Sequence, residues 1–226
     1  MSSTIYREYV SDDSFVQRLQ NMSFPFPSEM HIVVCFARDY DANMGKTDGI
    51  FRPVFDPSIT PQLIASFKQN SPSVVKFYLC IGGRGQTFPF TLINRPVWIN
   101  NATSSLAGII QQFKFDGLDV FYPTINTNVV DFVEAVNGLV TNLRTTQRVI
   151  TQASISTSQN VESPYLQLYR KNPSNFEYVL IGYSILPQDW NIIPYPVITT
   201  AVPQILNSGN NTLAHGTSVW AVTNEP

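Results

Sequence analysis

The chain is poor in charged side chains, which make up only 13% of its 226 residues. That share is about half of what an average globular protein carries. Fourteen Lys and Arg against 16 Asp and Glu give a formal charge of −2, and no run of like charges occurs. Binding to nucleic acid or to an anionic membrane needs a concentrated basic surface. We therefore expect neither a nucleic acid nor a membrane as partner.

Cysteine is equally scarce, because Cys35 and Cys80 are the only two in the chain. Both lie in apolar runs, without the dense spacing of disulfide scaffolds or zinc sites, so we expect buried, reduced thiols, no metal and no cofactor. No stretch of 18 apolar residues occurs, and the first ten residues contain no apolar signal-peptide core. This predicts a cytoplasmic protein without a membrane span or a secretory leader.

What the sequence does contain is an alternation of β-rich apolar runs and helical stripes, which is typical of βα units around a parallel sheet. The expected strands are Thr4–Val10, His31–Ala37, Val74–Ile81, Phe115–Tyr122, Arg148–Ser154, Phe176–Ser184 and Thr217–Val222. The expected helices are Pro61–Asn70, Leu106–Phe113, Val129–Leu143, a short one from Pro164 and Pro196–Leu206, where Pro203 favours a break.

This order of elements predicts the α/β class and a (β/α)8 TIM-type barrel. Such a barrel usually takes about 250 residues, with a lower limit near 200. The seven clear strands and the short last third therefore predict a barrel that is trimmed or incomplete in that third. No linker, repeat or low-complexity segment divides the chain, so residues 1–226 are expected to form a single domain.

The most informative motif is FDGLDVFYP, which spans Phe115–Pro123. It resembles the strand-four signature of glycoside hydrolase family 18, the chitinases, which reads D-G-x-D-x-D-x-E. Asp116, Gly117 and Asp119 match that signature. The resemblance implies the barrel fold, and the rest of the motif determines which of the family's activities to expect.

The resemblance implies that the chain has lost the catalytic acid of the family. Side chains alternate along a strand, so Asp119, Phe121 and Pro123 should face the barrel interior. In active members the last two inward positions are an aspartate that orients the substrate's acetamido group and a glutamate that protonates the leaving oxygen. Phe121 and Pro123 stand there instead, without a titratable proton. Asp116, Asp119, Phe121 and Pro123 are thus degenerate catalytic positions, and no enzymatic activity is expected.

Other segments resemble narbonin-like, non-catalytic plant members of this family: Ile5–Val10, Cys80–Gly85 and Ser218–Trp220, in that order. Where active members show Gln-x-Tyr-Asn on strand six, this chain has Gly182–Ile185, so a second catalytic element differs.

The glycine pair after Cys80 and Ile81 lacks the spacing of a phosphate-binding loop, and we expect a tight turn there. Asp119 is expected to be a buried carboxylate held by hydrogen bonds.

Three functions are compatible with this pattern. The first is a non-enzymatic plant protein with a storage or stress and defence role. The second is a lectin-like protein that binds chito-oligosaccharides or another glycan through Trp220, with Asp119, Phe121 and Tyr183 nearby; Trp220 is equally compatible with simple packing. The third is an inhibitor of glycanases or amylases. A monomer or a homodimer is expected, since the edge left by a missing strand would have to be covered.

Overall fold

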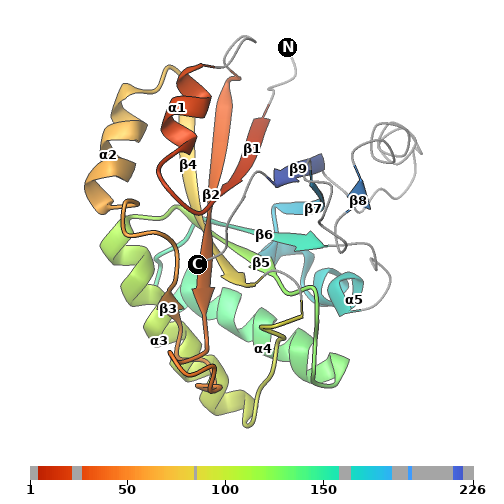
Figure 1. Cartoon of the computed structure of the whole chain (residues 1–226). Helices are drawn as coiled ribbons and strands as arrows, with labels where there is room; N and C mark the ends of the chain where they lie inside the picture. The colour runs from red at the N-terminus through yellow and green to blue at the C-terminus, as the bar shows by residue number, and fades with distance from the viewer. Residues whose placement is uncertain are drawn as a thin grey trace, which may run out of the picture.

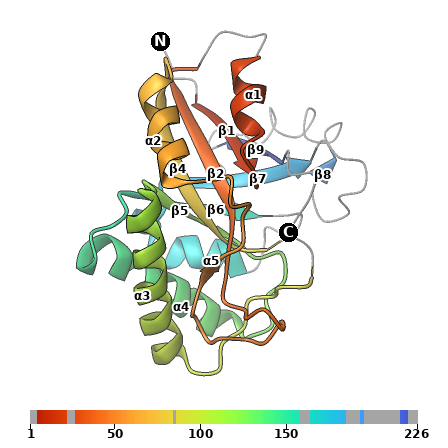
Figure 2. The same cartoon turned by 60° about the vertical axis from the view of Figure 1, so that its left-hand side comes forward.

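The computed structural model describes residues 5–21, 27–83, 86–157, 164–184, 193–194 and 216–220, and gives only the backbone at 157, 181–184, 193–194 and 216–220. Figure 1 shows a curled β-sheet with helices along its outer side, and the turned view of Figure 2 places α2 and α3 along one flank. None of the helices in these segments is long and apolar enough to cross a membrane.

The strands are β1 (Ile5–Val10), β2 (Glu29–Arg38), β3 (Arg52–Pro53), β4 (Val74–Gly82), β5 (Gly117–Phe121), β6 (Gln152–Thr157), β7 (Tyr178–Ser184), β8 (Ile193–Pro194) and β9 (Gly216–Trp220). The helices are α1 (Phe15–Gln20), α2 (Pro61–Asn70), α3 (Arg95–Phe113), α4 (Val129–Thr141) and α5 (Pro164–Lys171), with a π-turn at Asn142–Thr146 and a 3₁₀ turn at Pro173–Asn175.

Parallel pairing runs around the sheet in the order β1, β9, β7, β6, β5, β4 and β2, and β2 pairs again with β1. The two-residue β3 pairs antiparallel with the end of β2, and β8 pairs with the end of β7. This curled parallel sheet with helices outside confirms the expected TIM-type fold. In the described residues the ring contains seven full strands, one fewer than a complete (β/α)8 barrel, in line with the trimmed last third.

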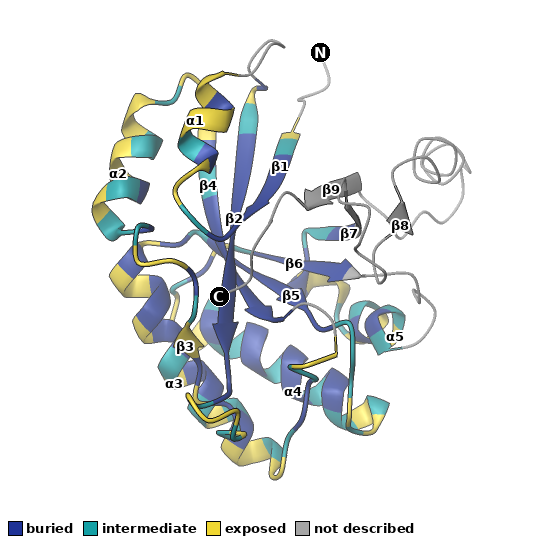
Figure 3. Cartoon of the chain, in the orientation of Figure 1, coloured by how far each residue is buried: buried dark blue, intermediate teal, exposed yellow. Residues whose placement is uncertain are grey.

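Each strand presents one row of side chains to the helices and the other to the barrel interior, as the period of two requires. The outer rows of β2, β4 and β5 supply aliphatic residues such as Ile32, Leu79 and Leu118 to the main core. A smaller apolar cluster inside the barrel includes Val33, Tyr78 and both cysteines. Figure 3 shows the buried residues running along these strands and the inner sides of α3 and α4.

Local sequence explains where the main helices begin. The side chain of Thr60 accepts a hydrogen bond from the backbone N–H of Leu63 at the start of α2, and Asn94 and Asn128 cap α3 and α4 in the same way. The cap at Asn94 places the start of α3 eleven residues before the predicted Leu106. Its first turns carry apolar side chains on both sides, with Val97 exposed and Trp98 buried, so they lack the one-sided stripe that predicts a helix.

The predicted strand Arg148–Ser154 was wrong at its start, since β6 runs from Gln152 to Thr157. Arg148 adopts φ +55°, a left-handed conformation that a strand cannot contain. The short α1 and β3 were not predicted. The expected helix Pro196–Leu206 lies outside the described residues.

Candidate functional site

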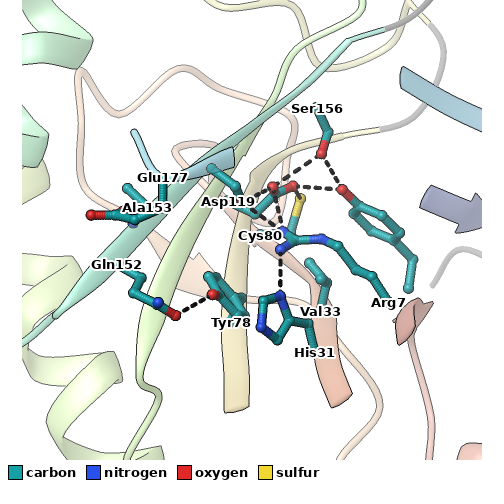
Figure 4. Close-up of polar contacts among 12 residues, drawn as sticks. Arg7, His31, Val33, Tyr78, Cys80, Asp119, Gln152, Ala153, Ser156 and Glu177 are labelled. Atoms are coloured by element: carbon teal, nitrogen blue, oxygen red, sulfur yellow. Dashed lines mark hydrogen bonds and ion pairs between the residues drawn. The ribbon is translucent and has the colours of Figure 1, made fainter. Parts of the chain in front are cut away.

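Asp119, on β5, lies at the centre of a polar cluster inside the barrel and has no exposed surface. Its carboxylate accepts hydrogen bonds from Arg7 Nη2 at 2.7 Å, from the Tyr9 hydroxyl at 3.0 Å and from Ser156 Oγ at 3.0 Å. Ser154 donates to the same carboxylate, and Arg7 Nη2 also donates to Ser154 Oγ at 2.6 Å. Figure 4 shows Arg7, Cys80 and Ser156 around Asp119. The expectation of a buried, hydrogen-bonded Asp119 is confirmed.

The strand register assembles this cluster. Cys80, Asp119 and Ser154 are directly paired positions on β4, β5 and β6, so their inward side chains meet at one level of the barrel. Cys80 Sγ donates a weak hydrogen bond to Asp119 at 3.4 Å. Burial, with the neighbouring Cys35 and Asp119, raises the pKa of the Cys80 thiol well above its ordinary value. Both cysteines are buried and free of disulfides, as expected, and the raised pKa of Cys80 disfavours its reactive thiolate form.

A row of polar groups continues from Arg7 to the amino end of the barrel. Arg7 Nη1 lies 3.4 Å from His31 Nδ1, and the opposite ring nitrogen, Nε2, lies 2.7 Å from Glu29 Oε1. Lys76 Nζ lies 2.6 Å from the same Glu29 oxygen, at the exposed end of the row. The Arg7 guanidinium also stacks over the Tyr78 ring, 4.5 Å from its centroid.

The pKa of His31 is lowered to about 4, chiefly by burial and also by the positive Arg7, while Glu29 opposes the shift. His31 is therefore neutral at pH 7, with Nδ1 facing Arg7 as acceptor and the Nε2 proton directed to Glu29. Burial, together with the negative Asp119, raises the pKa of the Tyr9 hydroxyl well above its ordinary value. The cluster thus contains the Arg7–Asp119 ion pair beside the neutral His31 and Tyr9.

Phe121 closes the interior toward the carboxyl end of β5, where βα-barrel enzymes place their catalytic groups. Its side chain is 2% exposed and stacks with Phe36, with 6.4 Å between the ring centroids and an interplanar angle of 19°. Phe36 is thus a packing residue inside the barrel. Pro123 follows β5 in a half-buried loop.

Tyr122 points away from the interior, as the alternation along β5 predicts. Its ring packs edge-on against Phe90 with 5.2 Å between centroids, and its backbone N–H donates to the Tyr165 hydroxyl at 2.5 Å. Phe121 thus faces the interior as expected, and Tyr122 lies on the helix side of the sheet.

Asp116 lies apart from the cluster, one residue before β5 at the amino end of the barrel. Its carboxylate accepts from the backbone N–H of Phe77 at 2.7 Å and pairs with Lys68 Nζ at 2.7 Å. The adjacent Gly117 has a packing role, because a Cβ there would lie 2.6 Å from the Tyr78 ring. In this chain the first two motif residues therefore fix the strand rather than form a site.

The tight turn expected after β4 falls in part on residues 84–85, which lie outside the described segments, but the described Gly82 does require glycine. Gly82 adopts φ +116°, and a Cβ there would lie 1.9 Å from the carbonyl oxygen of Phe121, so only glycine fits at this approach of β4 to β5.

Trp220 and Tyr183 occupy the paired strands β9 and β7, where Trp220 is in register with Tyr9 on one side and Ser184 on the other. Their side chains lie outside the described part of the structure, so the predicted glycan contact is an open hypothesis. Within the described residues, no group of three His, Cys, Asp or Glu is arranged to hold a metal ion.

Sequence reasoning missed Arg7, Tyr9 and the two serines as partners of Asp119, and His31 as a neighbour of Arg7. A usable signal was the presence of Arg7 in a strand expected to lie inside a helix-covered sheet, since a buried cation needs a buried anion. Ser156 was missed because the predicted strand ended at Ser154.

No protein-family model matches the chain. Among curated proteins it is 37% identical over 187 residues to the RuBisCO-associated protein of Glycine max, covering 78% of this chain and 64% of that protein. It is 29% identical over 186 residues to Chitinase 1 of Tulipa saxatilis subsp. bakeri, covering 79% of this chain and 59% of that protein. The chain thus spans about three-fifths of the length of these relatives.

Among solved structures, the family 18 chitinase from Crocus vernus matches with a TM-score of 0.78 and 25% identity, over 96% of this chain and 92% of that one. The catalytic domain of a family GH18 chitinase from the fern Peteris ryukyuensis matches with a TM-score of 0.74 and 25% identity, over 95% and 91%. The chain is therefore chitinase-like: it resembles plant family 18 chitinases in sequence and shares their fold.

Proposed function

We propose that the chain is a non-enzymatic, narbonin-like member of the plant chitinase-like proteins, with a role in storage or in stress and defence. The observation that carries this proposal is Phe121, which takes the inward position of the family's catalytic aspartate and is buried against Phe36. Pro123 takes the place of the glutamate that donates the proton. General acid catalysis needs a titratable group at that point.

Asp119 does not replace the missing acid. Its carboxylate is fully buried and is already engaged by Arg7, Tyr9 and both serines. Strand rise places Asp119 about 7 Å deeper along the barrel than Phe121, at roughly 3.3 Å per residue, and Pro123 follows beyond the end of the strand. A sugar bound at the mouth would be out of hydrogen-bond reach of this carboxylate.

The curated relative at 37% identity is named for association with RuBisCO and not for hydrolysis. That name supports a role in binding or storage over catalysis for this chain. Separately, we propose that the chain is a monomer or a homodimer.

The test is hydrolysis of chito-oligosaccharides by the purified protein, measured by product analysis beside a plant family 18 chitinase. We expect release of sugars at the background without enzyme. Turnover that disappears in Asp119→Asn, with the far-UV circular dichroism spectrum unchanged, would overturn the proposal.

Similarity to solved chitinases makes glycan binding at the barrel mouth the second candidate. Titration of tryptophan fluorescence with chito-oligosaccharides of increasing length distinguishes glycan binding from the storage role. A saturable change that Trp220→Ala abolishes favours the lectin-like role, and a flat titration favours storage. Inhibition of a glycanase or an amylase in the same buffers would identify the third candidate, the inhibitor.

A further inference from the structure

A polar groove lies on the outside of the barrel, between residues 100–111 of α3 and the π-turn that follows α4. Its volume is about 440 Å³, within the range of small-molecule sites. Asn100, Ser104 and Gln111 line it from α3, and Asn142, Thr146 and Gln147 line it from the π-turn side. Because α3 ends just before β5 begins, the groove lies near the amino end of the barrel, away from the mouth.

The lining of the groove includes a glycine that packing does not explain. Gly108 is exposed in the middle of the 19-residue α3, and a Cβ there would meet nothing within 4 Å. A mid-helix glycine costs roughly 0.5–1 kcal/mol relative to alanine. By contrast, Gly138 in α4 has a packing reason, since its Cβ would lie 2.9 Å from the Ile99 side chain. The bare backbone at Gly108 keeps the groove open at a cost in helix stability.

The lining of the groove contains no charged residue: seven of its nine residues carry an amide or a hydroxyl, and the other two are Ala107 and Gly108. Amides and hydroxyls each offer both donors and acceptors. The nearest arginine of the π-turn, Arg144, is engaged by Glu177 and by the Ser174 carbonyl oxygen. An anionic ligand such as a phosphate would therefore find no cation in the lining.

The two walls of the groove are tied together. Asn142 Nδ2 donates to Thr103 Oγ1 at 3.4 Å, and Gln147 donates its backbone N–H to the Asn142 carbonyl oxygen at 2.8 Å. The groove is thus preformed, which reduces the entropy that a ligand must offset on binding.

We propose that this groove binds a neutral, polyhydroxylated ligand of the oligosaccharide class. A sugar chain offers a dense set of hydroxyl donors and acceptors without charge, which matches the amide and hydroxyl lining. The groove is separate from the barrel interior. The proposal therefore does not depend on whether the barrel mouth is catalytically inactive.

The experiment is a titration of the ¹⁵N-labelled full chain with chitohexaose and, separately, with cellohexaose, followed by NMR. The groove-filling variant is Gly108→Phe, whose new ring points into open space. The matched control is Gln112→Phe, which adds the same ring to an exposed position of α3 outside the lining. Thermal unfolding of both variants verifies that the fold is retained.

We expect saturable shifts of the side-chain amide signals of Gln111, Asn142 and Gln147 with at least one hexaose. The apparent Kd should rise at least tenfold in Gly108→Phe and remain within twofold of wild type in Gln112→Phe. The proposal is overturned if neither hexaose shifts these signals, or if the shifts survive unchanged in Gly108→Phe. Shifts confined to the barrel mouth would instead support lectin-like binding there and count against the groove.

Discussion

Arg7 and Asp119 form an ion pair in the middle of the barrel, with Arg7 Nη2 2.7 Å from Asp119 Oδ1 and side chains only 4% and 0% exposed. Asp119 is the last acidic residue of the chitinase-like motif in this chain, because Phe121 and Pro123 follow it. Its carboxylate is held from β1 and β6, so it ties the first strand to the middle of the sheet. The remaining motif aspartate is thus a structural group.

Removing Arg7 should therefore destabilise the protein severely. Arg7→Met leaves Asp119 buried without its cation, and breaking such a pair costs about 3–5 kcal/mol. The measurement is the free energy of unfolding from urea denaturation at pH 7. The double variant Arg7→Met with Asp119→Leu removes both charges. Its loss of unfolding free energy should be smaller than the sum of the losses in the two single variants. Strictly additive losses would show that the two charges do not interact.

His31 should make the protein less stable in mild acid. Burial lowers the pKa of His31 to about 4, whereas the unfolded chain titrates near 6.5. Between these values the unfolded state binds the extra proton, so the free energy of unfolding falls as pH falls from 6.5 through 4. The loss amounts to about 3 kcal/mol.

The check is a series of unfolding curves from pH 7 to pH 3.5 on wild type and His31→Gln. Glutamine does not titrate and can still donate to Glu29, so the difference between the two proteins should shrink or reverse as the pH falls. An identical acid slope in both proteins would exclude His31 as its source.

The barrel and the inward row on β5 were predictable because both follow from local rules. Apolar runs with helical stripes between them define βα units, and alternation alone places Asp119 and Phe121 on one face and Tyr122 on the other. The partners of Asp119 come from strands 110 or more residues earlier and about 35 residues later in the chain. Their meeting depends on sheet register, which no local pattern determines.

The start of β6 shows the other kind of failure. The apolar residues after Arg148 resemble a strand, but the π-turn carries α4 three residues beyond the predicted Leu143, and Arg148 then turns with φ +55°. Neither feature has a sequence signal as strong as glycine or proline, so the predicted strand began too early.

Asp39 should make the protein less stable as the pH rises, the reverse of His31. It follows β2, is 3% exposed, and accepts a hydrogen bond from Trp98 Nε1 at 2.9 Å. Burial raises the pKa of Asp39 to about 6, although the Trp98 hydrogen bond opposes the shift. The protonated form is thus favoured on folding, and its contribution is lost as pH rises from 3.8 through 6.

Asp39→Asn keeps a neutral side chain whose oxygen can accept from Trp98. We expect the stability of the variant relative to wild type to increase between pH 4 and pH 6.5, by up to about 3 kcal/mol. Thermal unfolding across that range measures the gain. A stability difference that does not vary with pH would contradict the expectation.

Two glycine-to-alanine substitutions should change stability in opposite directions. At Gly117 the new Cβ would lie 2.6 Å from the Tyr78 ring and 2.8 Å from the Gln152 carbonyl oxygen. Tyr78 is fixed by the hydrogen bond from its hydroxyl to Gln152 Oε1 at 2.5 Å, so the ring cannot yield freely. Gly117→Ala should therefore cost about 1–3 kcal/mol, as overpacked cores do.

At Gly108 the added methyl group meets no atom within 4 Å and the backbone is helical. Gly108→Ala should therefore stabilise the protein by roughly 0.5–1 kcal/mol through helix propensity alone. Both variants are measured by urea unfolding under the same conditions. If Gly108→Ala destabilises the protein instead, the space above the helix is filled in solution, and the groove on α3 is not open to a ligand.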